Sequence, residues 1–312
     1  MAAEIRDSMQ RHPLRHFAAA VLVAILALVA APGALAARVG VLSNNYATQT
    51  AANFNANITG HTFTAVDTSV NVPLLATLLA NFDELLVFED AQFPSSYTNA
   101  PAVGNVVAAF AKSGRSVVLG TFYDQARSDA SPALSPPGWG ALETIDPNTT
   151  DGTGTPYAPR LLDATTLVVP HPLTAGVTSL YSSQWAGGNE SKPGTIVVGR
   201  WVQSNARGNP DPAIAYRISN GACVIHIAIA PHYPVLGTFG PVGAPTTDFG
   251  GDFYRVWHNA FDFAASQCVT GEANVPPTSL VAVPTLSAVG LALTALMVVV
   301  LATLSRVRAR RR

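Results

Sequence analysis

Arg38-Val-Gly-Val-Leu-Ser43 is a short apolar run that ends at two asparagines, Asn44 and Asn45. A similar run recurs at 116–121 as Ser-Val-Val-Leu-Gly-Thr, and helix-like and strand-like segments alternate between the two. Apolar runs of this length are typical of parallel strands that are buried on both faces. The expected strands are 38–43, 61–66, 83–88 and 116–121, and the expected helices between them are 48–58, 72–82 and 102–112. The alternation predicts an α/β fold with an open parallel sheet and helices on both faces.

The alternation stops after Asp124. Residues 125–160 are rich in Pro, Gly, Ser, Thr and Asp, and they are too long for a simple connection in a compact domain. We therefore expect an irregular insertion there. Strand patterns resume at 195–203 and 213–219, and Asn220-Gly221 predicts a hairpin turn before the apolar strand 223–230. A last helix is expected at 253–266, where apolar residues recur at helical spacing.

Polar side chains follow four of the expected strands. In open parallel sheets, ligands bind in the crevice beyond the carboxyl ends of the strands. The sequence therefore predicts a ligand rim made of Asn44, Glu89, Asp90, Tyr123, Asp124 and His232. Carboxylate, amide, phenol and imidazole groups suit a polyhydroxylated ligand or a hard cation such as calcium, and suit an anion poorly. The alternative is that each residue is an ordinary, solvated strand end.

Both ends of the chain carry membrane signals. Three arginines precede the apolar stretch 17–31, Pro32-Gly33 breaks it, and Ala34-Leu35-Ala36 offers a small-x-small cleavage pattern. Residues 1–37 are thus predicted to be a signal peptide, with an uncleaved anchor as the alternative. Near the C-terminus, residues 288–304 carry no charge and would span about 26 Å as a helix, close to the hydrocarbon thickness.

Five arginines follow that apolar stretch, so the positive-inside tendency places the body of the chain outside the cytoplasm. The expected divisions are a signal peptide (1–37), an α/β domain (38–268), a Pro/Thr/Val linker (269–282) and a C-terminal signal with a transmembrane helix (283–312). Without the two ends, about 245 residues remain, enough for a full core. They hold 10 basic and 17 acidic residues. This negative charge argues against nucleic acid or anionic lipid as a partner.

Cys223 and Cys268 are the only cysteines, and both fall in the exported body. An even count outside the cytoplasm predicts one disulfide between them. The alternative is a thiol nucleophile, but neither cysteine lies in a glycine-flanked turn from strand to helix.

The C-terminal segment resembles the IPTL-type sorting signal of exosortase-processed bacterial surface proteins. The motif begins with Val283, Pro284, Thr285 and Leu286, in which valine replaces the usual isoleucine; Ser287 and Gly290 also match. Ala288 and Val289 stand where glutamate and tryptophan are usual. The resemblance covers about a tenth of the chain. It implies processing by signal peptidase and an exosortase-like enzyme, transient anchoring in the inner membrane, and a final place in the cell envelope or extracellular matrix. A plain tail anchor is the alternative.

The body resembles the class I glutamine-amidotransferase-like fold, a flavodoxin-like open sheet, in its trehalose-utilisation-type branch. Three segments carry the resemblance. They are His171-Pro-Leu-Thr-Ala-Gly-Val177, the stretch 114–125 that matches the strand and nucleophile elbow, and the last helix around Trp257-His-Asn-Ala-Phe-Asp. Phe122 occupies the position of the nucleophilic cysteine, and Asp124 replaces a glycine. His232 faintly matches the family's histidine, but the glutamate that orients it is missing. Because a glutaminase needs a thiolate, no glutaminase activity is expected.

Three functions remain open. The first is a noncatalytic binding module with extracellular polysaccharide as a ligand. The second is a hydrolase or isomerase that acts on a carbohydrate-like ligand through a different set of residues. The third is a purely structural envelope protein. The sequence implies no cofactor, apart from calcium at the rim.

Overall fold

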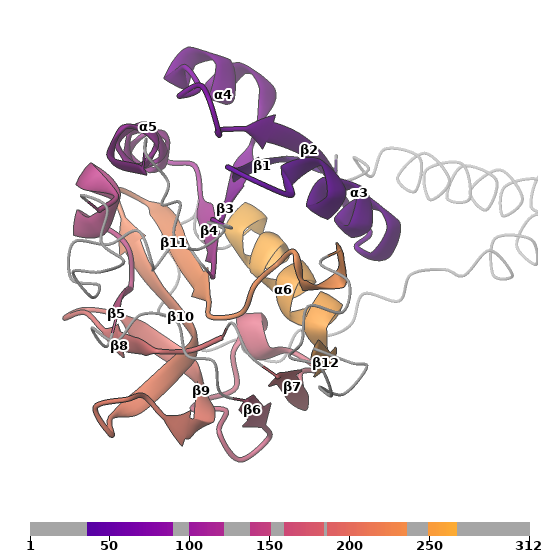
Figure 1. The fold of residues 1–312 in the computed structure, drawn as a ribbon, viewed down its shortest axis with the longest axis vertical. Helices are drawn as coiled ribbons and strands as arrows, with labels where there is room; N and C mark the ends of the chain where they lie inside the picture. The colour runs from indigo at the N-terminus through magenta and orange to yellow at the C-terminus, as the bar shows by residue number, and fades with distance from the viewer. Residues whose placement is uncertain are drawn as a thin grey trace, which may run out of the picture. The chain divides into compact units, whose positions relative to one another are not determined.

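The computed structural model describes residues 36–89, 100–121, 138–150, 159–183, 186–235 and 249–266. These residues form a mixed α/β fold, as the sequence predicted (Figure 1). All of them belong to the compact unit Met1–Ala273. Within this part of the chain no helix is both long enough and apolar enough to cross a membrane. The predicted signal peptide lies outside it except for residues 36 and 37, of which Ala37 begins β1. The predicted C-terminal helix and the sorting motif lie wholly outside it.

The central sheet has seven strands in the order β2-β1-β3-β4-β11-β10-β9. The strands are β1 (Ala37–Ser43), β2 (His61–Asp67), β3 (Glu84–Val87), β4 (Val117–Gly120), β9 (Ile196–Ser204), β10 (Pro210–Ser219) and β11 (Ala222–Ile227). The five strands from β2 to β11 are parallel, whereas β10 and β9 are antiparallel. The expectation of a parallel sheet therefore holds for five strands, and the sheet as a whole is mixed because β10 is antiparallel to both of its neighbours, β11 and β9.

The hairpin between β10 and β11 is confirmed. Asn220 and Gly221 join the two strands with φ values of 51° and 80°. Type I′ turns need positive φ at both central positions, which Asn-Gly tolerates best. The turn reverses the chain within the main sheet, and this reversal makes β10 antiparallel.

Helices cover both faces of the sheet (Figure 1). Helices α3 (Ala47–Asn57) and α6 (Phe253–Ser266) pack on one face, and α4 (Leu75–Asn81) and α5 (Ala100–Lys112) pack on the other. Consecutive residues of β3 show the division, because Leu86 joins the core on the α6 side while Leu85 and Val87 join the core on the α5 side. Burial on both faces explains why these strands are continuous apolar runs.

Two small antiparallel sheets lie outside the central one. The first contains β6 (Arg160–Asp163), β7 (Ser179–Ser182) and β12 (Phe249–Gly251), and the second contains β5 (Asn148–Thr150) and β8 (Asn189–Ser191). The described part of the expected insertion also holds a 3-10 helix, η2 (Gly140–Thr144). The insertion is therefore not wholly irregular: it includes η2 and β5.

Gly104 is the point where α5 contacts the backbone of Trp139, the residue directly before η2. A Cβ at this position would lie 1.9 Å from the carbonyl oxygen of the fully buried Trp139. Alanine normally favours a helix over glycine by about 1 kcal/mol. Here we expect Gly104→Ala to lower the free energy of unfolding by about 1–3 kcal/mol, because α5 and the Trp139 backbone must separate. Urea unfolding measures this loss. Gly250→Ala is the control, since no atom lies within 4 Å of its added Cβ; equal effects of the two changes would contradict the packing argument.

Candidate functional site

The carboxyl ends of the parallel strands carry the residues that the sequence singled out. Strand β1 ends at Ser43 and leads through Asn44 and Asn45 to Tyr46, which precedes α3. Tyr46 has a left-handed backbone, with φ 58°. The side-chain oxygen of Asn45 accepts a hydrogen bond from the Tyr46 amide at 3.0 Å, and the Ser43 hydroxyl accepts one from the Asn45 amide at 3.3 Å. Left-handed backbone is uncommon for a tyrosine and is found more often at functional sites.

His232 lies at the centre of this edge. Its ring is fully buried and stacks on Phe88, with ring centroids 4.9 Å apart and planes 16° apart. It also stacks on Tyr46, at 5.7 Å and 12°. Tyr46 follows β1, Phe88 follows β3 and His232 follows β11, so three strand ends meet at one imidazole. Both contacts cover the ring faces, and both ring nitrogens are buried as well.

The segment that carries His232 is held close to β4. The Thr121 amide donates a hydrogen bond to the Ile229 carbonyl at 3.2 Å. A Cβ on Gly120 would lie 2.7 Å from Pro231, so glycine is needed where the two segments approach. This packing fixes the position of His232 relative to the end of β4.

Glu89 is also buried at this edge, with 1% of its surface exposed. It directly follows Phe88, whose amide donates a hydrogen bond to the Leu42 carbonyl of β1 at 3.2 Å. Glu89 therefore follows the point where the ends of β1 and β3 adjoin. The burial of Glu89 and His232 contradicts the alternative that these two are solvated strand ends.

Three of the six predicted rim residues are described, namely Asn44, Glu89 and His232. The structure brings His232 against Tyr46 and Phe88, the near neighbours of Asn44 and Glu89 in the chain. Asp90, Tyr123 and Asp124 lie outside the described residues, as does Phe122 at the nucleophile position. Tyr46 and Phe88 were missed by the sequence reasoning, which considered only polar strand ends.

Cys223 is fully buried in β11 and is disulfide-bonded. Its amide donates a hydrogen bond to the Ser116 hydroxyl at 3.2 Å, and that hydroxyl donates to the Ala264 carbonyl of α6 at 3.3 Å. The start of β11 is thus linked to the end of α6. Cys268 lies outside the described residues, so its pairing with Cys223 stays a prediction.

The His171-Pro-Leu-Thr segment connects parts of the fold through its hydrogen bonds and ring contacts. Nδ1 of His171 accepts a hydrogen bond from the Leu173 amide at 3.1 Å and so caps the 3-10 helix η3 (Pro172–Thr174). Its ring packs against Tyr216 and Phe263, and burial lowers its pKa to about 4. Asn259 of α6 donates a hydrogen bond to the Ala175 carbonyl at 2.9 Å. The segment therefore joins the last helix to the sheet.

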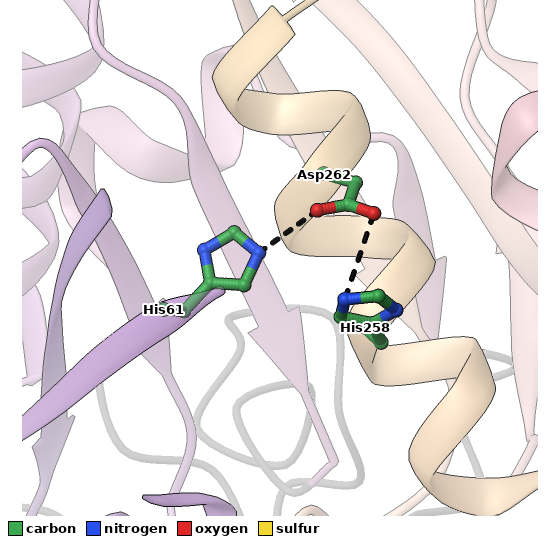
Figure 2. A group of neighbouring side chains, drawn as sticks. All are labelled: His61, His258 and Asp262. Carbon is green, nitrogen blue, oxygen red and sulfur yellow. Dashed lines mark hydrogen bonds and ion pairs between the residues drawn. The ribbon is translucent and has the colours of Figure 1, made fainter. Parts of the chain in front are cut away.

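A second polar cluster lies at the opposite, amino edge of the strands. His61 is the first residue of β2, and His258 and Asp262 are one turn apart on α6 (Figure 2). Nε2 of His61 lies 3.0 Å from one carboxylate oxygen of Asp262, and Nε2 of His258 lies 3.6 Å from the other. The hydrogen bond from His61 is the main cause that lowers the pKa of Asp262.

Glu84, the first residue of β3, lies at the same edge. It is 2% exposed, and in the described part of the chain neither carboxylate oxygen has a hydrogen-bond partner. Burial raises its pKa to about 9, and the negative charges of Asp83 and Asp262 add to the effect. The sequence reasoning missed this cluster. The i, i+4 spacing of His258 and Asp262 was a usable signal, but nothing in the sequence placed His61 beside them.

Comparison with known proteins gives no family. No family model and no curated protein matches the chain. Similar solved structures include the cytoplasmic protein STM1381 from Salmonella typhimurium LT2, at 10% identity over 73% of this chain and 99% of that one, with a TM-score of 0.47. They also include Agd3, a novel carbohydrate deacetylase, at 12% identity over 62% of this chain and 29% of that one, with a TM-score of 0.39. These likenesses are remote, and the chain spans less than a third of Agd3.

Proposed function

We propose that this chain is an exported bacterial surface or matrix protein whose α/β domain is a noncatalytic binding module. The proposed ligand is polyhydroxylated, such as an extracellular polysaccharide, and it binds at the carboxyl edge around His232. Export and exosortase-type sorting rest on the two terminal signals in the sequence. The binding role rests on the residues that meet at the carboxyl edge, namely Tyr46, Phe88 and His232.

The strand order supports this assignment of the fold. The parallel strands follow the order β2-β1-β3-β4-β11, which corresponds to the flavodoxin-like order 2-1-3-4-5. Such sheets bind ligands at the point where the order reverses, here between β1 and β3. An amidotransferase-like module of the flavodoxin-like class would use the same edge.

The observation that carries the proposal is the meeting of three strand ends at His232. Tyr46 and Phe88 stack on the His232 ring, and Glu89, a buried carboxylate, directly follows Phe88 in the chain. Small-molecule sites combine apolar and aromatic walls with a few converging polar groups. Calcium prefers several oxygen ligands, and among the described residues this edge offers one carboxylate, besides the imidazole of His232 and the neutral oxygens of Ser43, Asn44 and Asn45. A sugar-like ligand therefore fits better than calcium.

A thiol mechanism is not supported. Phe122 cannot act as a nucleophile at the elbow position, and Cys223 is buried in β11 and disulfide-bonded. Because the thiolate is the reactive form of cysteine, a bonded sulfur has no such role. We therefore propose binding without hydrolysis of glutamine.

Glu89→Gln tests the site. The change keeps the shape of the side chain and removes its charge, and hydrogen bonds to charged groups contribute about 1.5–3 kcal/mol. We expect cellohexaose, xylohexaose or maltohexaose to raise the thermal midpoint of the wild-type protein, and we expect this shift to fall strongly in the variant.

Asp83→Asn is the matched control, since Asp83 precedes the same strand at its other end and should leave the shift unchanged. Calcium is tested in parallel. A shift with calcium alone, or equal sugar shifts in both variants, would refute the proposed ligand class.

A further inference from the structure

The side chains at the amino edge have the composition of a transition-metal site. One donor atom from each of His61, His258 and Asp262 lies within 4.8 Å of the others. Zinc–ligand bonds of about 2.0–2.2 Å in a tetrahedron place donor atoms roughly 3.3 Å apart. The observed separations are close to that value: Nε2 of His61 lies 3.0 Å from Oδ1 of Asp262, and Nε2 of His258 lies 3.6 Å from Oδ2. Small rotations of the side chains would bring all three donors onto one ion.

The fold holds these donors in place. His258 and Asp262 project from the same face of α6 because they are four residues apart. The His61 ring is buried and packs against Phe261 of that helix, with centroids 5.7 Å apart. The rings of His61 and His258 are 5.9 Å apart and nearly perpendicular, at 79° (Figure 2). The site therefore joins the start of β2 to the last helix.

The charge around the cluster favours a cation. The carboxyl group of Glu84 is buried at the same edge without a hydrogen-bond partner among the described residues, and the negative charge of Asp262 disfavours its ionisation. Arg38, on the neighbouring strand β1, pairs with Asp83 at 2.8 Å, so this arginine already has its own partner. A divalent ion would compensate the negative charge of Asp262.

We infer that His61, His258 and Asp262 bind a divalent metal ion of the zinc type. Two imidazoles and one carboxylate suit zinc and related first-row ions, whereas calcium and magnesium prefer oxygen ligands. The side chains of His258 and Asp262 are 36% and 59% exposed. Solvent can therefore reach the ion and supply its remaining ligand. The ion would fasten α6 to β2 and stabilise the folded chain.

Calorimetry on the full-length chain, freed of metal by a chelator, tests this inference. We expect zinc to bind with one equivalent per chain at this site, and cobalt to give the strong visible absorption of a tetrahedral complex. Zinc at one hundred times the dissociation constant should raise the thermal midpoint by about 5 °C or more.

His258→Ala and Asp262→Asn should each weaken zinc binding at least tenfold and abolish the cobalt spectrum. Both side chains are partly exposed, so the fold should survive these changes. Arg255→Ala is the control, because it lies on the same helix outside the cluster and should bind zinc like the wild type. Absence of zinc binding, or binding that both ligand variants retain, would overturn the inference. Neither result depends on the carbohydrate site at the other edge.

Discussion

Replacing Asp211 by alanine is expected to lower the free energy of unfolding by about 3–5 kcal/mol. Asp211 lies on β10 and is fully buried. It accepts hydrogen bonds from the Gly188 amide at 2.6 Å and the Asn189 amide at 3.1 Å, and Nε of Arg160 lies 3.4 Å away. Alanine would leave a buried guanidinium and two amides without their acceptor. One carboxylate thus ties the central sheet to β6 and to the segment before β8.

Urea unfolding at pH 8 measures this effect. Burial raises the pKa of Asp211 to about 6, so the carboxylate is ionised at that pH. Arg207→Ala is the control, since the exposed ion pair between Arg207 and Glu190, at 2.9 Å, contributes at most about 1 kcal/mol. A loss below 1 kcal/mol for Asp211→Ala would show that this network does not hold the small sheets to the large one.

Replacing Glu84 by glutamine is expected to stabilise the protein at pH 7 by about 3 kcal/mol. Burial raises the pKa of Glu84 to about 9 in the folded chain, whereas the unfolded chain releases the proton near 4.5. Below pH 4.5 Glu84 is protonated in both the folded and the unfolded chain, and the folded chain has its full stability. As pH rises from 4.5 toward 9, only the unfolded chain loses this proton, and the free energy of unfolding falls. Glutamine resembles the protonated acid and has no such dependence.

The comparison of the wild-type chain with the Glu84→Gln variant across pH isolates this group. Asp83 and Asp262 are present in both chains, so the difference between the chains reports Glu84 and its coupling to these two carboxylates. We expect equal stabilities at pH 4 and a growing advantage of Glu84→Gln from pH 5 to 8, measured without metal by urea unfolding. Asp83→Asn should have the opposite sign, because Arg38 lowers the pKa of Asp83. A constant difference between the two chains at all pH values would contradict the burial of an uncharged Glu84.

Individual helices and strands were predictable from the sequence, because the spacing of apolar residues within each segment indicates its secondary structure. The last helix, expected at 253–266, has those bounds in the structure, and the strand at 38–43 differs only by one residue. Both are recognised from apolar spacing, which burial imposes directly. Asn220-Gly221 likewise predicted that β10 pairs antiparallel with β11. The strand order was not predictable in this way, since it depends on contacts between distant segments.

The carboxyl edge was predictable in part. Strand ends in a parallel sheet share one edge, and this rule alone singles out Asn44, Glu89 and His232. The same rule does not indicate that Tyr46 and Phe88 stack on His232. An aromatic residue at the end of a strand or the start of a helix is common, and nothing in the sequence around these two marks them. The amino-edge cluster was missed for a similar reason. His61 begins a strand far from α6 in the chain, and only the packed fold brings it to Asp262.

Isothermal titration calorimetry with a neutral oligosaccharide shows whether the carboxyl edge binds carbohydrate. We expect saturable binding to the wild-type protein and unchanged binding to Asp83→Asn. Binding to His232→Phe should be at least tenfold weaker, because phenylalanine keeps an aromatic ring in the stack but lacks the imidazole nitrogens. No heat of binding with any of the three hexasaccharides, or equal affinities for the wild type and His232→Phe, would contradict a carbohydrate site at this edge.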